Sequence, residues 1–127
     1  MFEIGDDFYK SIVKSRYPER KNKNYYRVWF YKENIEYFNP NGPAEIFYNE
    51  NGEINHKIYY LFGKIIKERK YNDFISKLKS GYIEKNINKY WDLNRIKEIC
   101  EFAKYYLLNE LAEKCNTIMI AEKLSGN

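Results

Sequence analysis

Residues 45–62, EIFYNENGEINHKIYYLF, decide the fold of this chain. Two runs rich in aromatic and β-branched residues flank Asn51-Gly52, the dipeptide that best fits a two-residue hairpin turn because both turn residues need positive φ. This turn predicts two cross-strand pairs, Phe47 with His56 and Ile46 with Lys57. It also places Glu50 opposite Glu53, an unfavourable like-charge pair, so a longer loop is the alternative.

The residues before this hairpin continue the antiparallel pattern. Residues 25–31, YYRVWFY, are dense in aromatic and β-branched side chains and predict a strand, and a second strand is expected over residues 34–38. Asn39-Pro40-Asn41-Gly42 has the residue preferences of a type I turn. Gly63 ends the last long strand, and residues 64–66 can continue it briefly. An antiparallel β-meander is therefore predicted over about residues 25–66.

The N-terminal segment, residues 1–24, is predicted to form a short helix followed by a basic loop. Asp6 or Asp7 would cap the helix, and Pro18 would stop it. One side of this helix would carry Phe8, Ile12 and Val13.

Helices are predicted over residues 71–125. The first, residues 71–80, repeats apolar side chains at three- and four-residue spacing and ends before Gly81, a residue suited to the left-handed C-terminal cap. A less defined segment containing Ile83 and Ile87 follows it.

Asp92 is the predicted N-cap of the longest helix, and Trp91 and Ile96 stand at the positions of a hydrophobic staple. The helix carries one apolar stripe, formed by Leu93, Ile96, Cys100, Ala103, Leu107 and Leu111. A single helix to the C-terminus would be about 50 Å long, so a break is expected near Asn116-Thr117. These segments predict a single α+β domain in which the β-meander packs against the C-terminal helices.

Charge is distributed in stripes along the chain. The net charge is +4, a modest value that does not by itself indicate nucleic-acid binding. Residues 10–27 carry seven basic residues and one acid, residues 64–89 carry eight and three, and residues 33–53 carry five glutamates and no basic residue. Lys, Asn, Ile and Tyr form nearly half of the chain. Their AT-rich codons are an alternative explanation for the abundance of tyrosine and lysine.

The sequence predicts neither a membrane span nor a secretory signal. The chain has no run of about eighteen apolar residues, and its first residues are acidic, so a cytoplasmic location is expected, in the host cytoplasm if a phage encodes the protein. Cys100 and Cys115 would lie about 22 Å apart on a continuous helix, so a disulfide would need a chain reversal between them. Two free, buried thiols are expected, which suits a reducing compartment.

No residue pattern predicts catalysis. His56 is the only histidine and lies in a different element from both cysteines, which argues against a zinc site. Every glycine is isolated, so the chain has no glycine-rich phosphate loop. Glu45, Glu50 and Glu53 could hold a metal ion in a nuclease, but glutamates beside a turn are usually solvated. We therefore expect no catalytic residue, no metal and no cofactor.

The β-meander also carries a set of short motifs. They are Gly42-Pro43-Ala44, Tyr48, Asn51-Gly52, Tyr59-Tyr60 and Gly63-Lys64. In this order they resemble a bacterial and viral variant of the MORN repeat, a hairpin repeat with a Gly-Pro-Ala core found in toxin–antitoxin-associated and phage proteins. The match covers residues 25–78 and departs from the usual pattern at Tyr37-Phe38, Asn41 and Phe62. The resemblance implies stacked hairpins, a short helix after them, and a role in binding rather than catalysis.

The leading hypothesis is a non-enzymatic protein interaction module. A phage or other mobile element could encode it as an anti-CRISPR or other anti-defence inhibitor, or as an antitoxin. A period-two strand buries one face, so the other face should expose the aromatic residues common at interface hot spots. The expected partner-binding residues are Tyr25, Arg27, Trp29, Tyr31, Glu45, Glu50 and Glu53. The glutamates could occupy a basic, nucleic-acid-binding groove of the partner.

The alternative hypothesis is direct binding of RNA or DNA by the two basic segments, residues 10–27 and 64–89. Basic residues beside aromatics suit phosphate contact together with base stacking. The expected contacts are Arg16, Arg20, Lys21, Lys23, Lys67, Arg69 and Lys70. Neither the identity of the partner nor the oligomeric state follows from the sequence.

Overall fold

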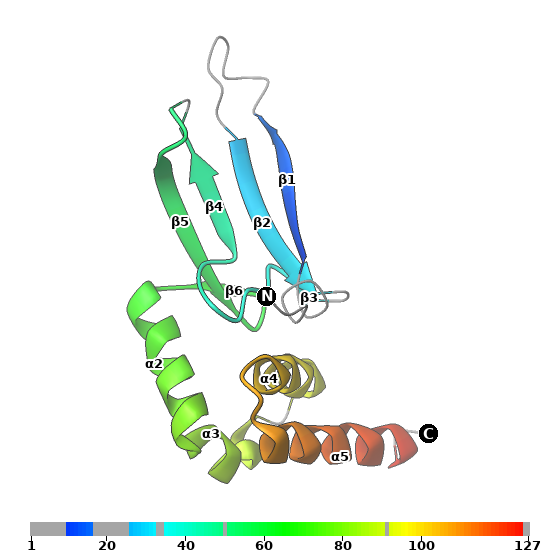
Figure 1. The fold of residues 1–127 in the computed structure, drawn as a ribbon. Helices are drawn as coiled ribbons and strands as arrows, with labels where there is room; N and C mark the ends of the chain where they lie inside the picture. The colour runs from blue at the N-terminus through cyan, green and yellow to red at the C-terminus, as the bar shows by residue number, and fades with distance from the viewer. Residues whose placement is uncertain (1–9, 17–25, 33–34, 50, 91, 126–127) are drawn as a thin grey trace. The chain divides into compact units, whose positions relative to one another are not determined.

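A computed structural model of the chain describes residues 10–16, 26–32, 35–49, 51–90 and 92–125. The predicted α+β fold, an antiparallel sheet followed by C-terminal helices, is confirmed (Figure 1). The chain forms two compact units, residues 1–71 and 72–127, and each is described by itself. That both belong to a single domain stays a prediction. Among the described residues, no helix combines the length and apolar character needed to cross a membrane.

The first unit is an antiparallel sheet. Its strands are β1 (Lys10–Arg16), β2 (Tyr26–Lys32), β3 (Ile35–Glu36), β4 (Glu45–Tyr48), β5 (Ile54–Leu61) and β6 (Lys64–Ile66). The strand order is β1-β2-β4-β5-β6, and the two-residue β3 also pairs with β2 (Figure 1). The predicted β-meander is therefore present, with β1 added to its first edge.

The N-terminal helix predicted from the sequence is wrong over Lys10–Arg16, because these residues form β1. Ile12 pairs with Trp29 and Val13 with Val28. A short apolar run fits either a helix face or a strand. Here the run pairs with the backbone of β2, and this pairing favours the strand. The predicted N-cap and the proline stop lie outside the described residues.

The predicted register of the β4–β5 hairpin is confirmed. The two expected pairs, Phe47 with His56 and Ile46 with Lys57, are both present. The predicted two-residue turn is wrong, because the N–H of Asn49 donates to the carbonyl of Glu53 at 2.9 Å and Tyr48 pairs with Ile54. The connection is one residue longer than predicted, and a β-bulge beside Ile54 restores the register.

The side chain of Asn49 supports this longer turn. Its Oδ1 accepts hydrogen bonds from the backbone N–H of Asn51 at 2.9 Å and of Glu53 at 3.1 Å. The N–H of Gly52 donates to the carbonyl of Asn49 at 3.0 Å, and Gly52 has a φ of 82°. A tight turn followed by a left-handed residue is the usual form of a three-residue hairpin loop. The longer loop also places Asn49, rather than Glu50, across from Glu53.

The two-residue turn with positive φ at both positions occurs instead at Phe62-Gly63, which joins β5 to β6. Phe62 has a φ of 55° and Gly63 a φ of 79°, and Leu61 pairs with Lys64 across the turn. These are the features of a type I′ turn. Phenylalanine is unfavourable in this backbone conformation, so the sequence indicated only that the strand ends near Gly63.

A tyrosine hydroxyl closes the turn predicted at residues 39–42. The Tyr71 hydroxyl accepts from the N–H of Gly42 at 3.1 Å and donates to the carbonyl of Asn39 at 2.6 Å. The Asn39 side chain adds bonds to Asn41 N at 2.9 Å and to Pro43 O at 2.8 Å. This network includes Asn39 and Tyr71, which are buried. The most buried residues of the sheet unit include Phe38, Pro40, Ala44, Tyr59 and Tyr71.

The second unit is helical. Its elements are the greater part of α2 (Glu68–Ser80), then α3 (Tyr82–Lys85), the 3-10 helix η1 (Ile87–Lys89), α4 (Leu93–Tyr105) and α5 (Asn109–Ser125). Gly81, with a φ of 91°, follows α2 as predicted. The predicted N-cap of α4 is confirmed, because Asp92 Oδ1 accepts from the N–H of Asn94 at 2.8 Å. The other half of the expected staple, Trp91, lies outside the described residues.

The break predicted near Asn116-Thr117 is wrong, because α5 continues through these residues. The chain reverses earlier, at Leu107, which has a φ of 59°. The N–H of Leu108 donates to the carbonyl of Ala103 at 2.8 Å, and that of Leu107 donates to the carbonyl of Lys104 at 3.2 Å. These two bonds form a Schellman motif with leucine where glycine is usual. Leu107, predicted to lie on the apolar stripe, is 65% exposed.

The reversal gives the helical unit its own core. Ile83, Ile96, Ile99, Phe102 and Leu111 are almost completely buried, and the Phe74 and Phe102 rings meet edge to face at 5.2 Å. Cys100 and Cys115 are free and buried, as predicted. Burial, with a contribution from Cys100, raises the pKa of Cys115 to about 12.

Candidate functional site

The residues predicted to bind a partner or a nucleic acid fall into three groups. Tyr25, Arg20, Lys21, Lys23 and Glu50 lie outside the described residues. Arg16 and Arg27 lie in β1 and β2, where only their backbone is described. The remaining predicted residues, Trp29, Tyr31, Glu45, Glu53, Lys67, Arg69 and Lys70, have described side chains.

The two faces of β2 do not differ in burial as the sequence suggested. Trp29 and Tyr31 point to one face, and Val28 and Phe30 point to the other. All four side chains are half-buried. The aromatic residues of β2 therefore do not by themselves identify a binding face.

Glu45 is a buried carboxylate. Its side chain is only 4% exposed and accepts a hydrogen bond from the Tyr60 hydroxyl at 3.1 Å. The Tyr60 ring stacks on Tyr37 with the ring centroids 4.4 Å apart. Glu45 pairs with Ile58, whereas the exposed Glu53 lies beyond the other end of β4. The structure therefore does not bring Glu45 and Glu53 together in one acidic surface.

One side of β5 is only partly paired with another strand. This strand pairs with β4 along one side, but β6 covers only Tyr59–Leu61 on the other side. Within the described ranges, no strand pairs with residues 54–58 along that second side. Four consecutive residues, Ile54, Asn55, His56 and Lys57, are exposed. Among the described strands, more than half of β5 thus presents an edge without a neighbour (Figure 1).

Backbone hydrogen-bonding groups point outward along this edge. The carbonyl of Ile58 accepts a hydrogen bond from the N–H of Ala44 at 3.0 Å, so the amide groups of Ile58 face β4. In an antiparallel strand, successive residues direct their amide groups to opposite sides. The N–H and carbonyl of Lys57 therefore point away from β4, where a further strand could pair with them.

A groove of about 570 Å³ runs beside this edge. It is lined by the consecutive residues Ile54 to Tyr59 of β5 and by Ile65, Ile66, Lys67 and Glu68. Consecutive strand residues point to opposite faces, so a groove that touches all of them must follow the strand edge rather than either face. Ile54 is 54% exposed and Ile65 is 68% exposed, which leaves apolar surface in the groove.

The surroundings of the groove are basic. Residues 54–70 carry five basic residues, Lys57, Lys64, Lys67, Arg69 and Lys70, and one acid, Glu68. Glu68 interacts with Tyr59. Burial is the largest cause that raises the pKa of the Tyr59 hydroxyl, and the hydrogen bond and the negative charge of Glu68 raise this pKa further. The five basic side chains are exposed, and none forms an ion pair with another described residue. We call this edge and its basic surroundings, residues 54–70, the open edge.

The open edge includes Lys67, Arg69 and Lys70 from the sequence prediction, but sequence reasoning missed Ile54, Lys57 and Ile65. A signal was present in the segment lengths. The predicted last long strand, residues 53–62, is much longer than the residues 64–66 that follow Gly63 before the helix. A three-residue strand can cover only part of its longer neighbour, so the remainder has to stay open or receive another strand.

Apart from the open edge, the described part of the chain has few groups that suggest a binding or catalytic site. No three His, Cys, Asp or Glu side chains there come close enough together to hold a metal ion. His56 lies beside Phe47, with the ring centroids 6.0 Å apart. The helical unit has a second groove, lined by Glu84, Glu110, Glu113, Lys114, Thr117 and Ile118, in which Lys114 and Glu84 form an ion pair at 3.4 Å.

Comparisons with known proteins add no relative. No family model matches the chain, and no curated protein or solved structure matches it significantly. The resemblance to the MORN-variant repeat stays a prediction.

Proposed function

We propose that this chain is a non-enzymatic protein-binding module that takes up an extended segment of a partner as an additional strand beside β5. The observation that carries the proposal is the open edge, where Ile54–Lys57 are exposed and, among the described residues, no strand pairs with residues 54–58 on the side away from β4. Proteins usually protect such edges, because unpaired amide groups can template pairing with another chain. A groove with exposed isoleucines beside the edge supports binding of side chains as well as backbone.

Such binding suits a small inhibitor. A chain that acts by occupying its partner needs a stable surface and no reaction chemistry, and the open edge supplies that surface. Anti-defence proteins, including anti-CRISPR proteins, and antitoxins act in this way, and we place the chain in this class of mobile-element or bacterial inhibitors.

Nucleic-acid binding is the second candidate function. Lys67, Arg69 and Lys70 are exposed within one basic segment, and phosphate groups bind such segments through charge alone. The open amide groups of β5 favour the protein-binding function, because a peptide backbone can pair with both the N–H and the carbonyl of Lys57.

Affinity purification from the native host tests the proposed function with three variants. Ile65→Ser removes apolar surface from the groove, and Lys57→Pro removes the outward N–H without removing a bond to β4. Ile120→Ser is the matched control, because Ile120 is a similarly exposed isoleucine, 51%, on α5. We expect the wild type and Ile120→Ser to retain a protein partner after nuclease treatment, and the other two variants to lose it.

The proposed function would be wrong if Ile65→Ser and Lys57→Pro retained the partner as well as the wild type did. Loss of the partner on nuclease treatment would instead support the nucleic-acid alternative. Thermal unfolding of each variant controls for structure. The two exposed isoleucine substitutions should change stability by only about 0.5 kcal/mol, and the melting temperature of Lys57→Pro shows whether the proline disturbs β5.

A further inference from the structure

We infer that the open edge selects an acidic extended segment, in which carboxylate side chains alternate with apolar side chains. This inference rests on the proposed function and adds the chemistry of the partner. It follows from three observations on the described residues: the direction of the Lys57 amide groups, the charge of residues 54–70, and the faces on which Lys57 and Ile65 lie.

The charge of the open edge favours an acidic partner. Residues 54–70 have a net charge of +4, which equals the net charge of the whole chain. The one carboxylate, Glu68, already interacts with Tyr59. A partner that brings carboxylates next to these exposed cations gains cross-strand charge pairs, and a basic partner would be repelled.

The two faces of the sheet differ along this edge. Strand pairing places Lys57 on the same face as Ile46, and Lys64 shares that face because it pairs with Leu61. Ile58 lies on the opposite face, together with Ile65, which pairs with Tyr60. A strand added in line with β6 would therefore meet Lys57 and Lys64 on one face and Ile58 and Ile65 on the other, whereas the β-bulge places Ile54, which pairs with Tyr48, on the lysine face.

Hydrogen-bond geometry determines which residues of the partner lie opposite Lys57. Its outward N–H and carbonyl form a hydrogen-bonded pair with the residue directly opposite, and cross-strand partners share a face. That residue is a carboxylate in our assignment, so the amide groups of the acidic residues point toward β5. The open stretch of five residues, 54–58, corresponds to about 17 Å of extended partner.

A second copy of this chain does not fit these requirements. Two open edges placed side by side would bring two segments of net charge +4 together and two Lys57 side chains close to one another. Lysine on an edge strand is a common means of preventing self-pairing. The cations thus exclude self-association while leaving the edge available to an acidic strand.

A nucleic acid also carries negative charge, but it meets fewer features of the site. Phosphates can contact the lysines, yet they offer no alternating donor and acceptor groups to the backbone of β5. The exposed isoleucines beside the edge would likewise receive no apolar side chain. The backbone and the groove therefore favour a peptide.

Four capped seven-residue peptides test the inference with the full chain. The first alternates valine and glutamate, and the second replaces each glutamate with lysine. The third is the first peptide with N-methyl groups on its glutamates, and the fourth, the matched control, has N-methyl groups on its valines. Binding is followed by fluorescence polarisation and by the backbone amide NMR shifts of residues 54–58.

We expect the glutamate peptide to bind with shifts confined to the open edge, and the lysine peptide to bind at least about tenfold more weakly. N-methylation of the glutamates should abolish binding, whereas N-methylation of the valines should leave it intact. Lys57→Glu should lower the affinity for the glutamate peptide about tenfold and raise the affinity for the lysine peptide. The control Lys97→Glu, an exposed position on α4, should change neither affinity.

Three results would overturn the inference: equal affinity for the two peptides, equal effects of the two N-methylations, or no binding at about 1 mM peptide. Displacement of the peptide by a mixed-sequence oligonucleotide with the same shifts would replace it with the nucleic-acid alternative. Failure here is distinct from failure of the proposed function. If no peptide binds but Ile65→Ser still loses the host partner, the edge binds a protein of different chemistry.

Discussion

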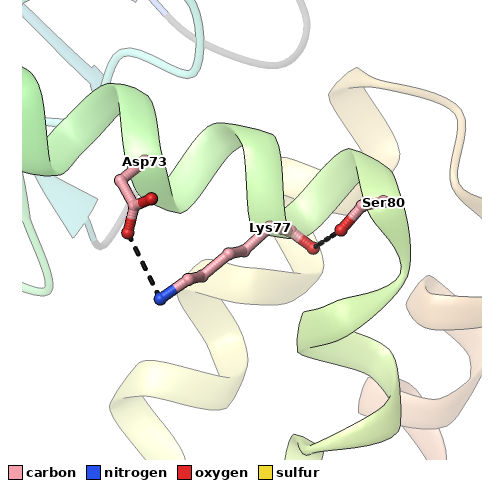
Figure 2. A network of polar contacts seen from close by, with 3 residues as sticks. All are labelled: Asp73, Lys77 and Ser80. Carbon is pink, nitrogen blue, oxygen red and sulfur yellow. Dashed lines mark hydrogen bonds and ion pairs between the residues drawn. The ribbon is translucent and has the colours of Figure 1, made fainter.

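The exposed cations of the helical unit and those of the open edge differ in whether they form ion pairs. On the helices, several exposed cations are paired locally: Lys77 with Asp73 at 3.2 Å, Lys104 with Glu101 at 3.6 Å and Lys114 with Glu84 at 3.4 Å. Figure 2 shows the first of these pairs, together with the Ser80 hydroxyl that donates to the carbonyl of Lys77 at 3.2 Å. The five cations of the open edge have no such partners among the described residues.

This difference indicates where an external partner would gain most. Surface ion pairs on a helix contribute little stability, but they neutralise charge that another molecule could use. At the open edge, charge, amide groups and isoleucines are all available in one place. The comparison predicts that substitutions in the helical unit act mainly on stability and that substitutions at the open edge act mainly on binding.

The largest stability effect is expected for Phe102→Ala. Phe102 is 1% exposed and packs against Phe74, so truncation leaves a cavity in the helical core. We expect a loss of about 3–5 kcal/mol in the free energy of unfolding, measured by urea denaturation. Ile65→Ala at the open edge is the contrasting variant and should cost less than about 1 kcal/mol. Equal losses for the two variants would contradict the distinction between the units.

The sheet unit also has one stability-determining polar contact, at Tyr71. Tyr71→Phe removes the hydroxyl that joins Gly42 N to Asn39 O, and leaves a buried carbonyl and a part-buried N–H without this partner. We expect a loss of about 1–3 kcal/mol, measured by thermal and urea unfolding. Tyr82→Phe, at a tyrosine that is 42% exposed, serves as the control and should be nearly neutral. A neutral Tyr71→Phe would show that the turn holds without the hydroxyl.

A substitution at Leu107 is expected to stabilise the helical unit. Its φ of 59° is unfavourable for a residue with a Cβ atom, so Leu107→Gly should stabilise the chain by about 1 kcal/mol. Leu107→Ala keeps the Cβ atom and should give no such gain. A difference in melting temperature between the two variants measures the backbone effect, and its absence would mean that the leucine side chain compensates for the strain.

The smallest effect is expected from mildly alkaline pH on the helical core. Burial raises the pKa of the Cys115 thiol from 9.0 to about 12, so the folded state holds its proton more tightly than the unfolded state. The corresponding stability is fully present below about pH 9 and is lost as pH rises toward 12. The melting temperature should fall slightly between pH 8 and pH 10, and Cys115→Ala should reduce this fall. An identical pH profile in both proteins would assign the decline to other groups.

Local sequence patterns predicted most of the sheet. Residues 25–31, 45–50 and 53–62 were each recognised as strands from β-branched and aromatic content, and the pairs Phe47–His56 and Ile46–Lys57 followed from the turn between them. Helix boundaries at Gly81 and Asp92 were also local, because they depend on one left-handed residue and one capping side chain. The reversal at Leu107 was missed because leucine gives no turn signal.

Features that depend on a distant partner were not predictable in this way. Lys10–Arg16 became a strand because β2 offered an edge, although their own pattern also fits a helix. Glu45 looked like one of five surface carboxylates, and its burial against Tyr60 depends on how β4 and β5 pair. The open edge itself was missed, because it depends on which strand lies beside another.

The sequence by itself thus determined where the strands from β2 to β6 lie, where the helices at Gly81 and Asp92 have their boundaries, and how the central hairpin is registered, because these follow from side-chain alternation and from residues within one turn. Only the tertiary structure decided that Lys10–Arg16 form a strand beside β2 and that β5 leaves Lys57 facing outward in the groove that Ile65 also lines. The physical reason is that the pairing of a strand edge depends on which other strand lies beside it, and folding brings strands that are distant in the sequence together.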